Sequence, residues 1–91
     1  MFCITKWSKN ITDSGEDQYT HRLPIMKQKL KEKYGSVPDL HRFRLLDDDG
    51  IVYAYGQNTD FDFAPLDRYE YVYGCTEIQY LNSATKQYET F

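Results

Sequence analysis

The sequence has no long apolar run, and its first residues lack the apolar core of a secretory signal. The opening segment MFCITKWSKN places Lys6 and Lys9 after its apolar residues, whereas a signal peptide carries its basic residues first. A transmembrane helix needs about 20 consecutive, mostly apolar residues, and no segment approaches that length. These absences predict a cytoplasmic protein that does not enter a membrane.

Cysteine is scarce, since the chain contains Cys3 and Cys75 alone. The two could pair if the first strand lay near residue 75. Two cysteines without a secretory signal are, however, usually reduced and serve as small apolar residues. The sequence therefore predicts two free thiols.

Signatures of catalysis are also missing. His21 and His41 are the two histidines of the chain, and nothing in their spacing brings them together as an acid–base pair. Neither cysteine lies in a Cys–His signature, and no serine has the context of a nucleophile elbow. The acidic run Asp47–Asp49 lacks the alternate ligands and the distal glutamate of an EF-hand. We therefore expect a protein that is not an enzyme and holds no cofactor.

Basic residues are few in the second half of the chain. Residues 46–91 contain two Lys/Arg and nine Asp/Glu, a net charge of −7, whereas residues 1–45 contain nine and five, a net charge of +4. The two halves together give the −3 of the whole chain. An acidic half with few cations repels nucleic acid and attracts basic partners. Charge thus favours a basic protein as the partner.

The chain does contain enough apolar material for one domain. Its 91 residues are 41% hydrophobic and 16% aromatic, which predicts a single folded domain over residues 1–91. Residues 2–7 are β-prone and predict a strand. Pro24 suits a first helical turn and Gly35 a helix end, so a helix is predicted over 24–34, with a kinked extension over 16–23 left open. Its apolar positions share one face: Tyr19, Leu23, Met26, Leu30 and Tyr34.

Two hairpins are predicted in the rest of the chain. Residues 41–55 hold two β-prone runs around Asp48-Asp49-Gly50, where Gly50 can adopt the positive φ of a tight turn. Residues 76–91 predict a second hairpin, and residues 56–66 an irregular connection. The expected fold class is α+β, with one main helix packed on a mainly antiparallel sheet of four to five strands built from these two hairpins.

Three blocks of this region, FRLLDDDGIVYAYG, FAPLD and GCTEIQYLN, carry a resemblance. The chain resembles a group of small bacterial and phage proteins over roughly residues 42–91, whereas the first 40 residues show no such likeness. The resemblance implies the hairpin architecture and an origin in a mobile element. It implies no activity.

Residues 66–74, LDRYEYVYG, place a tyrosine at every second position. The segment could be an edge strand, a binding surface or a half-buried loop. Nine tyrosines exceed what one small core can use, because each hydroxyl needs a hydrogen-bond partner, and tyrosine is favoured at binding hot spots. We expect the tyrosines to be half core and half binding surface. The predicted partner-binding residues are Asp60, Asp62, Asp67, Tyr69, Glu70, Tyr71 and Tyr73.

These observations predict a small protein-binding module that is not an enzyme. It would modulate or inhibit a basic, nucleic-acid-handling partner through an acidic, tyrosine-rich surface, as a phage anti-defence protein of the anti-CRISPR kind would do. One alternative is a nucleic-acid-binding protein that uses the basic helix, with Arg22, Lys27, Lys29, Lys31 and Lys33. The other is a small metal-dependent nuclease or hydrolase, with oxygen ligands from Asp60, Asp62, Asp67 and Glu70.

Overall fold

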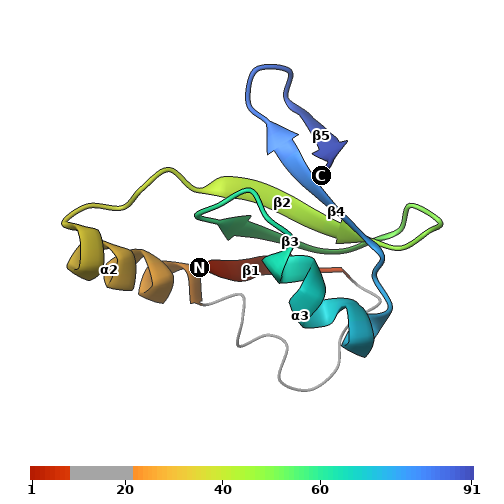
Figure 1. The fold of residues 1–91 in the computed structure, drawn as a ribbon, viewed down its shortest axis with the longest axis horizontal. Helices are drawn as coiled ribbons and strands as arrows, with labels where there is room; N and C mark the ends of the chain where they lie inside the picture. The colour runs from red at the N-terminus through yellow and green to blue at the C-terminus, as the bar shows by residue number, and fades with distance from the viewer. Residues whose placement is uncertain (9–21) are drawn as a thin grey trace.

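A computed structural model describes residues 1–8 and 22–91 of the protein, apart from the side chains of Arg22 and Val72. The expected helical extension over 16–21, with Tyr19 and His21, lies outside the described residues. Two helices and five strands follow one another along the described chain (Figure 1). Their bounds are β1 Phe2–Trp7, α2 Arg22–Tyr34, β2 His41–Leu46, β3 Val52–Asn58, α3 Ala64–Tyr73, β4 Glu77–Asn82 and β5 Gln87–Thr90.

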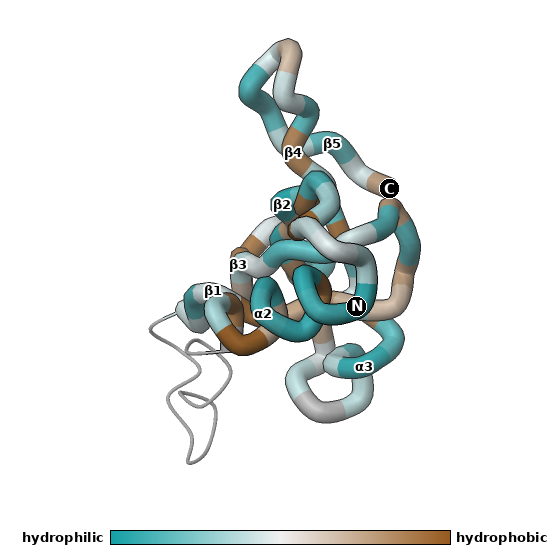
Figure 2. The backbone as a smooth tube through the Cα atoms, turned by 90° about the vertical axis from the view of Figure 1, so that its left-hand side faces the viewer, coloured by the Kyte–Doolittle hydropathy of each residue, from teal (hydrophilic) through white to brown (hydrophobic). Residues whose placement is uncertain are grey.

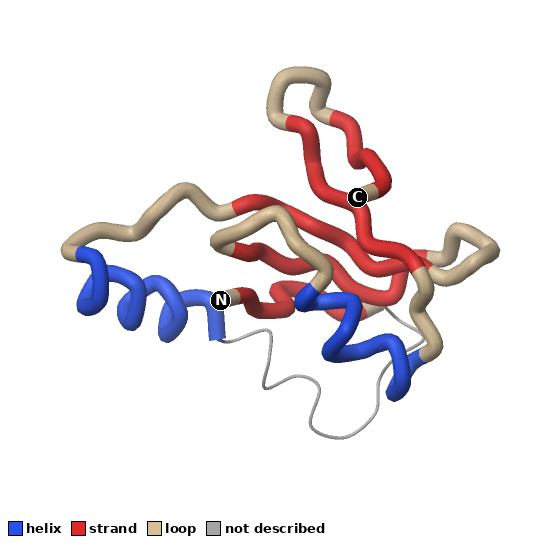
Figure 3. The backbone as a smooth tube through the Cα atoms, viewed as in Figure 1, coloured by secondary structure: helices blue, strands red, loops and turns tan. Residues whose placement is uncertain are grey.

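The five strands form one antiparallel sheet in the order β1-β3-β2-β4-β5 (Figure 3). This confirms the α+β class and the antiparallel sheet. β2 with β3 and β4 with β5 form the two hairpins, and β1 adds the fifth strand at the edge of β3. In the first hairpin, Gly50 has a φ of +79°. The carboxylate of Asp47 holds this turn, since it accepts hydrogen bonds from the backbone N–H groups of Asp49 and Ile51 at 2.9 and 3.0 Å.

The main core lies on one face of the sheet. Ile4, Gly56, Phe43 and Tyr80 are register neighbours across four strands, and residues directly opposite one another share a face. Gly56 is required at its place, because a Cβ there would collide with the Phe43 ring and with the Cys3 carbonyl oxygen. The missing side chain thus lets the Phe43 ring lie directly on the backbone of β3.

Helix α3 covers this face, and its presence corrects the expectation of one helix. Residues 64–73, predicted in part as an irregular connection and in part as a strand or loop, are helical from Ala64 to Tyr73. Pro65 lies in the first turn, where its fixed φ suits a helix start, and Gly74 ends the helix. Leu66 and Tyr69 are buried against the main core.

Helix α2 packs elsewhere, on β1. Met26 and Leu30 bury the Cys3 side chain, and Leu23 and Leu40 pack around them. Tyr34, the last position of the predicted stripe, is 60% exposed instead, because α2 ends there, beyond the small cluster around Cys3. Most of α2 is hydrophilic (Figure 2), so its contact with the sheet is narrow.

The two cysteines are free and buried, one beside each helix. Burial raises the pKa of both the Cys3 and the Cys75 thiol. No helix within the described residues has the length and apolar character needed to cross a membrane.

Candidate functional site

The three alternating tyrosines lie on two different sides of α3. Tyr69 is 4% exposed and Tyr71 is 93% exposed. Tyr69 and Tyr73 are one helical turn apart, and their rings lie 5.4 and 5.1 Å from the Trp7 ring. Tyr71 falls between them in sequence and therefore on the opposite side of the helix. Of the three, Tyr71 alone offers its whole ring to a partner.

The four predicted carboxylates do not converge. Asp62 accepts hydrogen bonds from the Asn58 side chain and the Ala64 backbone N–H, each at 3.0 Å. Asp60 and Asp67 are exposed, and Glu70 is half-buried. In the described part of the chain, no three His, Cys, Asp or Glu side chains are placed to hold a metal ion.

A buried polar network fixes the loop before α3. Asn58 is 1% exposed, and its side-chain N–H donates to the Tyr80 hydroxyl at 2.9 Å. The Tyr80 hydroxyl in turn donates to the Asp62 carbonyl oxygen at 2.8 Å. The neutral phenol is therefore both donor and acceptor, and burial raises its pKa. This network ties residues 58–62 to strand β4.

The fixed loop carries two exposed phenylalanines that the sequence reading did not select. Phe61 is 53% exposed, Phe63 is 48% exposed, and Phe91, which follows β5, is 45% exposed. The ring centres of Phe63 and Phe91 lie 4.8 Å apart. The Tyr80 ring centre lies 5.1 Å from that of Phe61 and 5.4 Å from that of Phe91. The four rings therefore form one connected group, of which three are at the surface.

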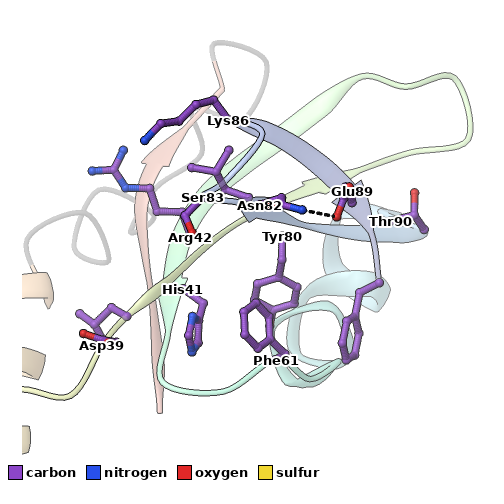
Figure 4. Close-up of a pocket in the computed structure, with 13 residues that line it drawn as sticks. Asp39, His41, Arg42, Phe61, Tyr80, Asn82, Ser83, Lys86, Glu89 and Thr90 are labelled. Atoms are coloured by element: carbon purple, nitrogen blue, oxygen red, sulfur yellow. Dashed lines mark hydrogen bonds between the residues drawn. The ribbon is translucent and has the colours of Figure 1, made fainter.

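Beside this group lies a pocket of about 770 Å³ (Figure 4). His41, at the start of β2, stacks on Phe61 with ring centres 3.9 Å apart. Figure 4 shows the rings of His41, Phe61 and Tyr80 at one end of the pocket, with Arg42 and Lys86 at the other. Glu89 also lines it and accepts a hydrogen bond from the Asn82 side chain at 3.2 Å. The charges around this pocket are of both signs, so it favours no ligand charge.

The aromatic group continues along the outer side of α3. Phe63, Asp67 and Tyr71 are spaced four residues apart, which places them along one side of a helix, and all three are exposed. We call the resulting region the aromatic–acidic surface. Its members are Asp60, Phe61, Phe63, Asp67, Tyr71 and Phe91.

The basic residues of α2 form no comparable surface. Lys27, Lys29, Lys31 and Lys33 are all exposed, but residues two apart on a helix point in different directions. The cations are therefore spread around the helix, with Lys33 above the neighbouring Tyr34 ring at 5.2 Å.

One signal in the sequence could have revealed Phe61 and Phe63. They alternate with aspartates in DFDF, directly before Ala64-Pro65 and within a turn-rich segment. Two large aromatics in a polar connection have no strand or helix pattern to bury them. Phe91 gives no such signal, because its neighbours become known only when β5 is placed beside β4.

Comparison of the chain with models of known protein families, with curated proteins and with solved structures finds no match.

Proposed function

We propose that the protein is a binding module, not an enzyme, and that it captures a basic protein through the aromatic–acidic surface. The observation that carries this proposal is the connected group of exposed rings around Tyr80. Small soluble proteins rarely leave large aromatic side chains together at the surface without a binding role. Aromatic side chains are also enriched among the residues that dominate binding energy.

The fold orders the aromatic–acidic surface before a partner binds. Asn58 and Tyr80 fix the loop that carries Phe61 and Phe63, and Tyr71 projects from a regular helix. A contact group that is ordered before binding loses less conformational entropy when the partner arrives. This favours recognition of a folded protein surface.

Charge favours a basic partner. Asp60 and Asp67 lie on the surface beside the exposed rings, and exposed carboxylates accelerate the encounter with positively charged proteins. The exposed Tyr71 ring can take an arginine or lysine of the partner on its face. Contacts of this kind would block the basic surface for other ligands, so the bound protein would inhibit its partner.

The biological setting that we propose is phage anti-defence. Small size, an acidic binding surface and the resemblance to proteins of mobile elements support it. In that setting, the basic partner would be a protein that handles nucleic acid.

A capture experiment tests the proposal. Immobilised wild-type protein should retain a basic protein from a bacterial lysate, and the Phe63→Ser, Tyr71→Ala variant should lose it. Tyr34→Ala is a matched control, since Tyr34 is also an exposed tyrosine on a helix, at 60% exposure. Equal capture by both variants would show that the aromatic–acidic surface is not the binding site.

The nucleic-acid alternative has its own test. Binding through lysines would weaken steeply as salt rises, because phosphate contacts release counterions. We expect no binding of single-stranded or double-stranded DNA or RNA at physiological salt. Binding that disappears in the Lys29→Glu, Lys33→Glu variant would favour the basic helix instead.

A further inference from the structure

A second cavity lies between the two helices, at the start of β1. Figures 1 and 2 both show the N-terminus with α2 on one side and α3 on the other. The cavity has a volume of about 560 Å³, within the range of small-molecule sites. Its lining residues are Met1, Phe2, Cys3, Ile25, Met26, Lys29, Arg68 and Tyr69.

Most of this lining is apolar. Met26 and Tyr69 are buried at 4% exposure each, whereas Ile25 remains 53% exposed at the side of the cavity. Ile25 leaves apolar surface in contact with water, and covering that surface would be favourable. The flexible Met26 side chain can adapt its shape to a ligand. The cavity is therefore lined mainly by apolar side chains, and the Met26 side chain can change its conformation to fit a ligand.

The charged residues of the lining are both cations. Lys29 comes from α2 and Arg68 from α3, and no Asp or Glu of residues 1–8 and 22–91 lines the cavity. Within the described residues neither side chain is held in an ion pair, and the Arg68 guanidinium lies 5.3 Å from the Tyr69 ring centre. In a chain of net charge −3, this is a local excess of positive charge.

We propose that this cavity binds a small amphiphilic anion, with an acidic head group between Lys29 and Arg68 and an apolar body along Ile25, Met26 and Phe2. A planar guanidinium pairs with a carboxylate through two parallel hydrogen bonds, and Lys29 adds a second positive charge. An apolar body would cover Ile25 and the edge of Phe2. This proposal does not rest on the aromatic–acidic surface, whose residues do not line the cavity.

Decanoate, below its micelle concentration, is the probe that tests it. Isothermal titration should show saturable binding of decanoate to the wild-type protein and none of decyltrimethylammonium, which has the same apolar chain and the opposite charge. The Lys29→Gln, Arg68→Gln variant should bind decanoate at least about tenfold more weakly, because each charge-assisted contact is worth roughly that factor. Amide chemical shifts of Phe2, Ile25 and Met26 should move during the titration.

A matched variant separates this site from general attraction to positive charge. Lys31→Gln, Lys33→Gln removes the same charge from exposed positions of α2 that do not line the cavity, and it should bind decanoate as the wild type does. Absence of decanoate binding to the wild type would overturn the proposal. Equal affinity for decyltrimethylammonium would overturn it as well. So would an equal loss of decanoate affinity in the Lys29→Gln, Arg68→Gln variant and in the Lys31→Gln, Lys33→Gln variant.

Discussion

Helices α2 and α3 are attached to the same sheet in different ways. α2 is the longer, with 13 residues against 10, but it buries Met26 and Leu30 in a small cluster with Cys3 of the edge strand. α3 places Leu66 and Tyr69 in the main core, which is shared by four strands. We infer that α3 is held more firmly than α2, although it is the shorter helix. The difference lies in how many other elements the buried side chains of each helix meet.

The largest effect that we expect is from Tyr69→Ala. It should lower the free energy of unfolding by about 3–5 kcal/mol, because it removes a buried aromatic ring from the main core. Urea unfolding followed by circular dichroism measures this loss. Tyr71→Ala, on the opposite side of the same helix, should change stability by less than about 0.5 kcal/mol. Similar losses in both variants would contradict the placement of α3.

Leu30→Ala should cost less than Tyr69→Ala. Leu30 is 1% exposed, but its cluster is small, so we expect about 2–3 kcal/mol, in the lower part of the range for Leu→Ala substitutions. The same urea titration gives the value. A loss larger than that of Tyr69→Ala would mean that α2, and not α3, is the more firmly held helix.

Tyr80→Phe should weaken the attachment of α3 alone, because the Tyr80 hydroxyl holds the loop before that helix. The Asn58 side chain and the Asp62 carbonyl would each lose a partner, at a cost of about 1–3 kcal/mol. Amide exchange should accelerate in residues 59–63 and leave α2 unchanged. Equal acceleration in residues 59–63 and in α2 would show that the network has a global role.

This network also predicts a loss of stability at alkaline pH. Burial raises the pKa of Tyr80 in the folded protein, so the folded state binds the phenol proton more tightly than the unfolded state does. The stability that the protonated Tyr80 contributes is fully present below the unfolded pKa of about 10. It is lost as pH rises through the raised pKa of the folded state. Urea midpoints at about pH 8 and about pH 11 should therefore differ less in Tyr80→Phe than in the wild type. Burial also raises the pKa of Tyr53 and Tyr88. Part of the loss of stability at alkaline pH should therefore remain in both proteins.

The smallest effect concerns the rates at which the two thiols react. Both are buried with a raised pKa, so a disulfide reagent should modify them slowly at neutral pH. Cys3 should react faster than Cys75, because opening of α2, which we infer to be the less firmly held helix, is enough to expose it. Cys3→Ala and Cys75→Ala leave one thiol each and allow the rates to be compared. A faster Cys75 would reverse the order of stability that we infer for the two helices.

The elements that could be predicted are those with a strong local pattern. β1 begins and ends where the β-prone run FCITKW does, and the Asp-Gly turn marks the first hairpin. α2 was recognisable from Pro24, Gly35 and the spacing of Met26 and Leu30. In each case neighbouring residues alone restrict the backbone, so tertiary contacts had little to change.

The candidate site was only partly predictable. The acidic region and its exposed Asp60, Asp67 and Tyr71 were selected from the sequence, but Phe61, Phe63 and Phe91 were not. The placement of Phe61 and Phe63 follows from the hydrogen bonds of Asn58 and Tyr80, which join residues 22 and 18 positions apart, and that of Phe91 follows from the pairing of β5 with β4. Such contacts leave no periodic pattern in the sequence.

The sequence by itself determined the local elements other than α3, the two hairpin turns and the unequal distribution of charge. Tertiary structure decided the conformation of residues 66–74. Of the three tyrosines, only Tyr71 changes sides between a strand and a helix, whereas Leu66 shares a side with Tyr69 and Tyr73 in a helix alone. The spacing of the tyrosines by itself therefore fits both conformations. The sheet settles the choice, because a helix buries Leu66 and Tyr69 against the main core and leaves Tyr71 in solvent.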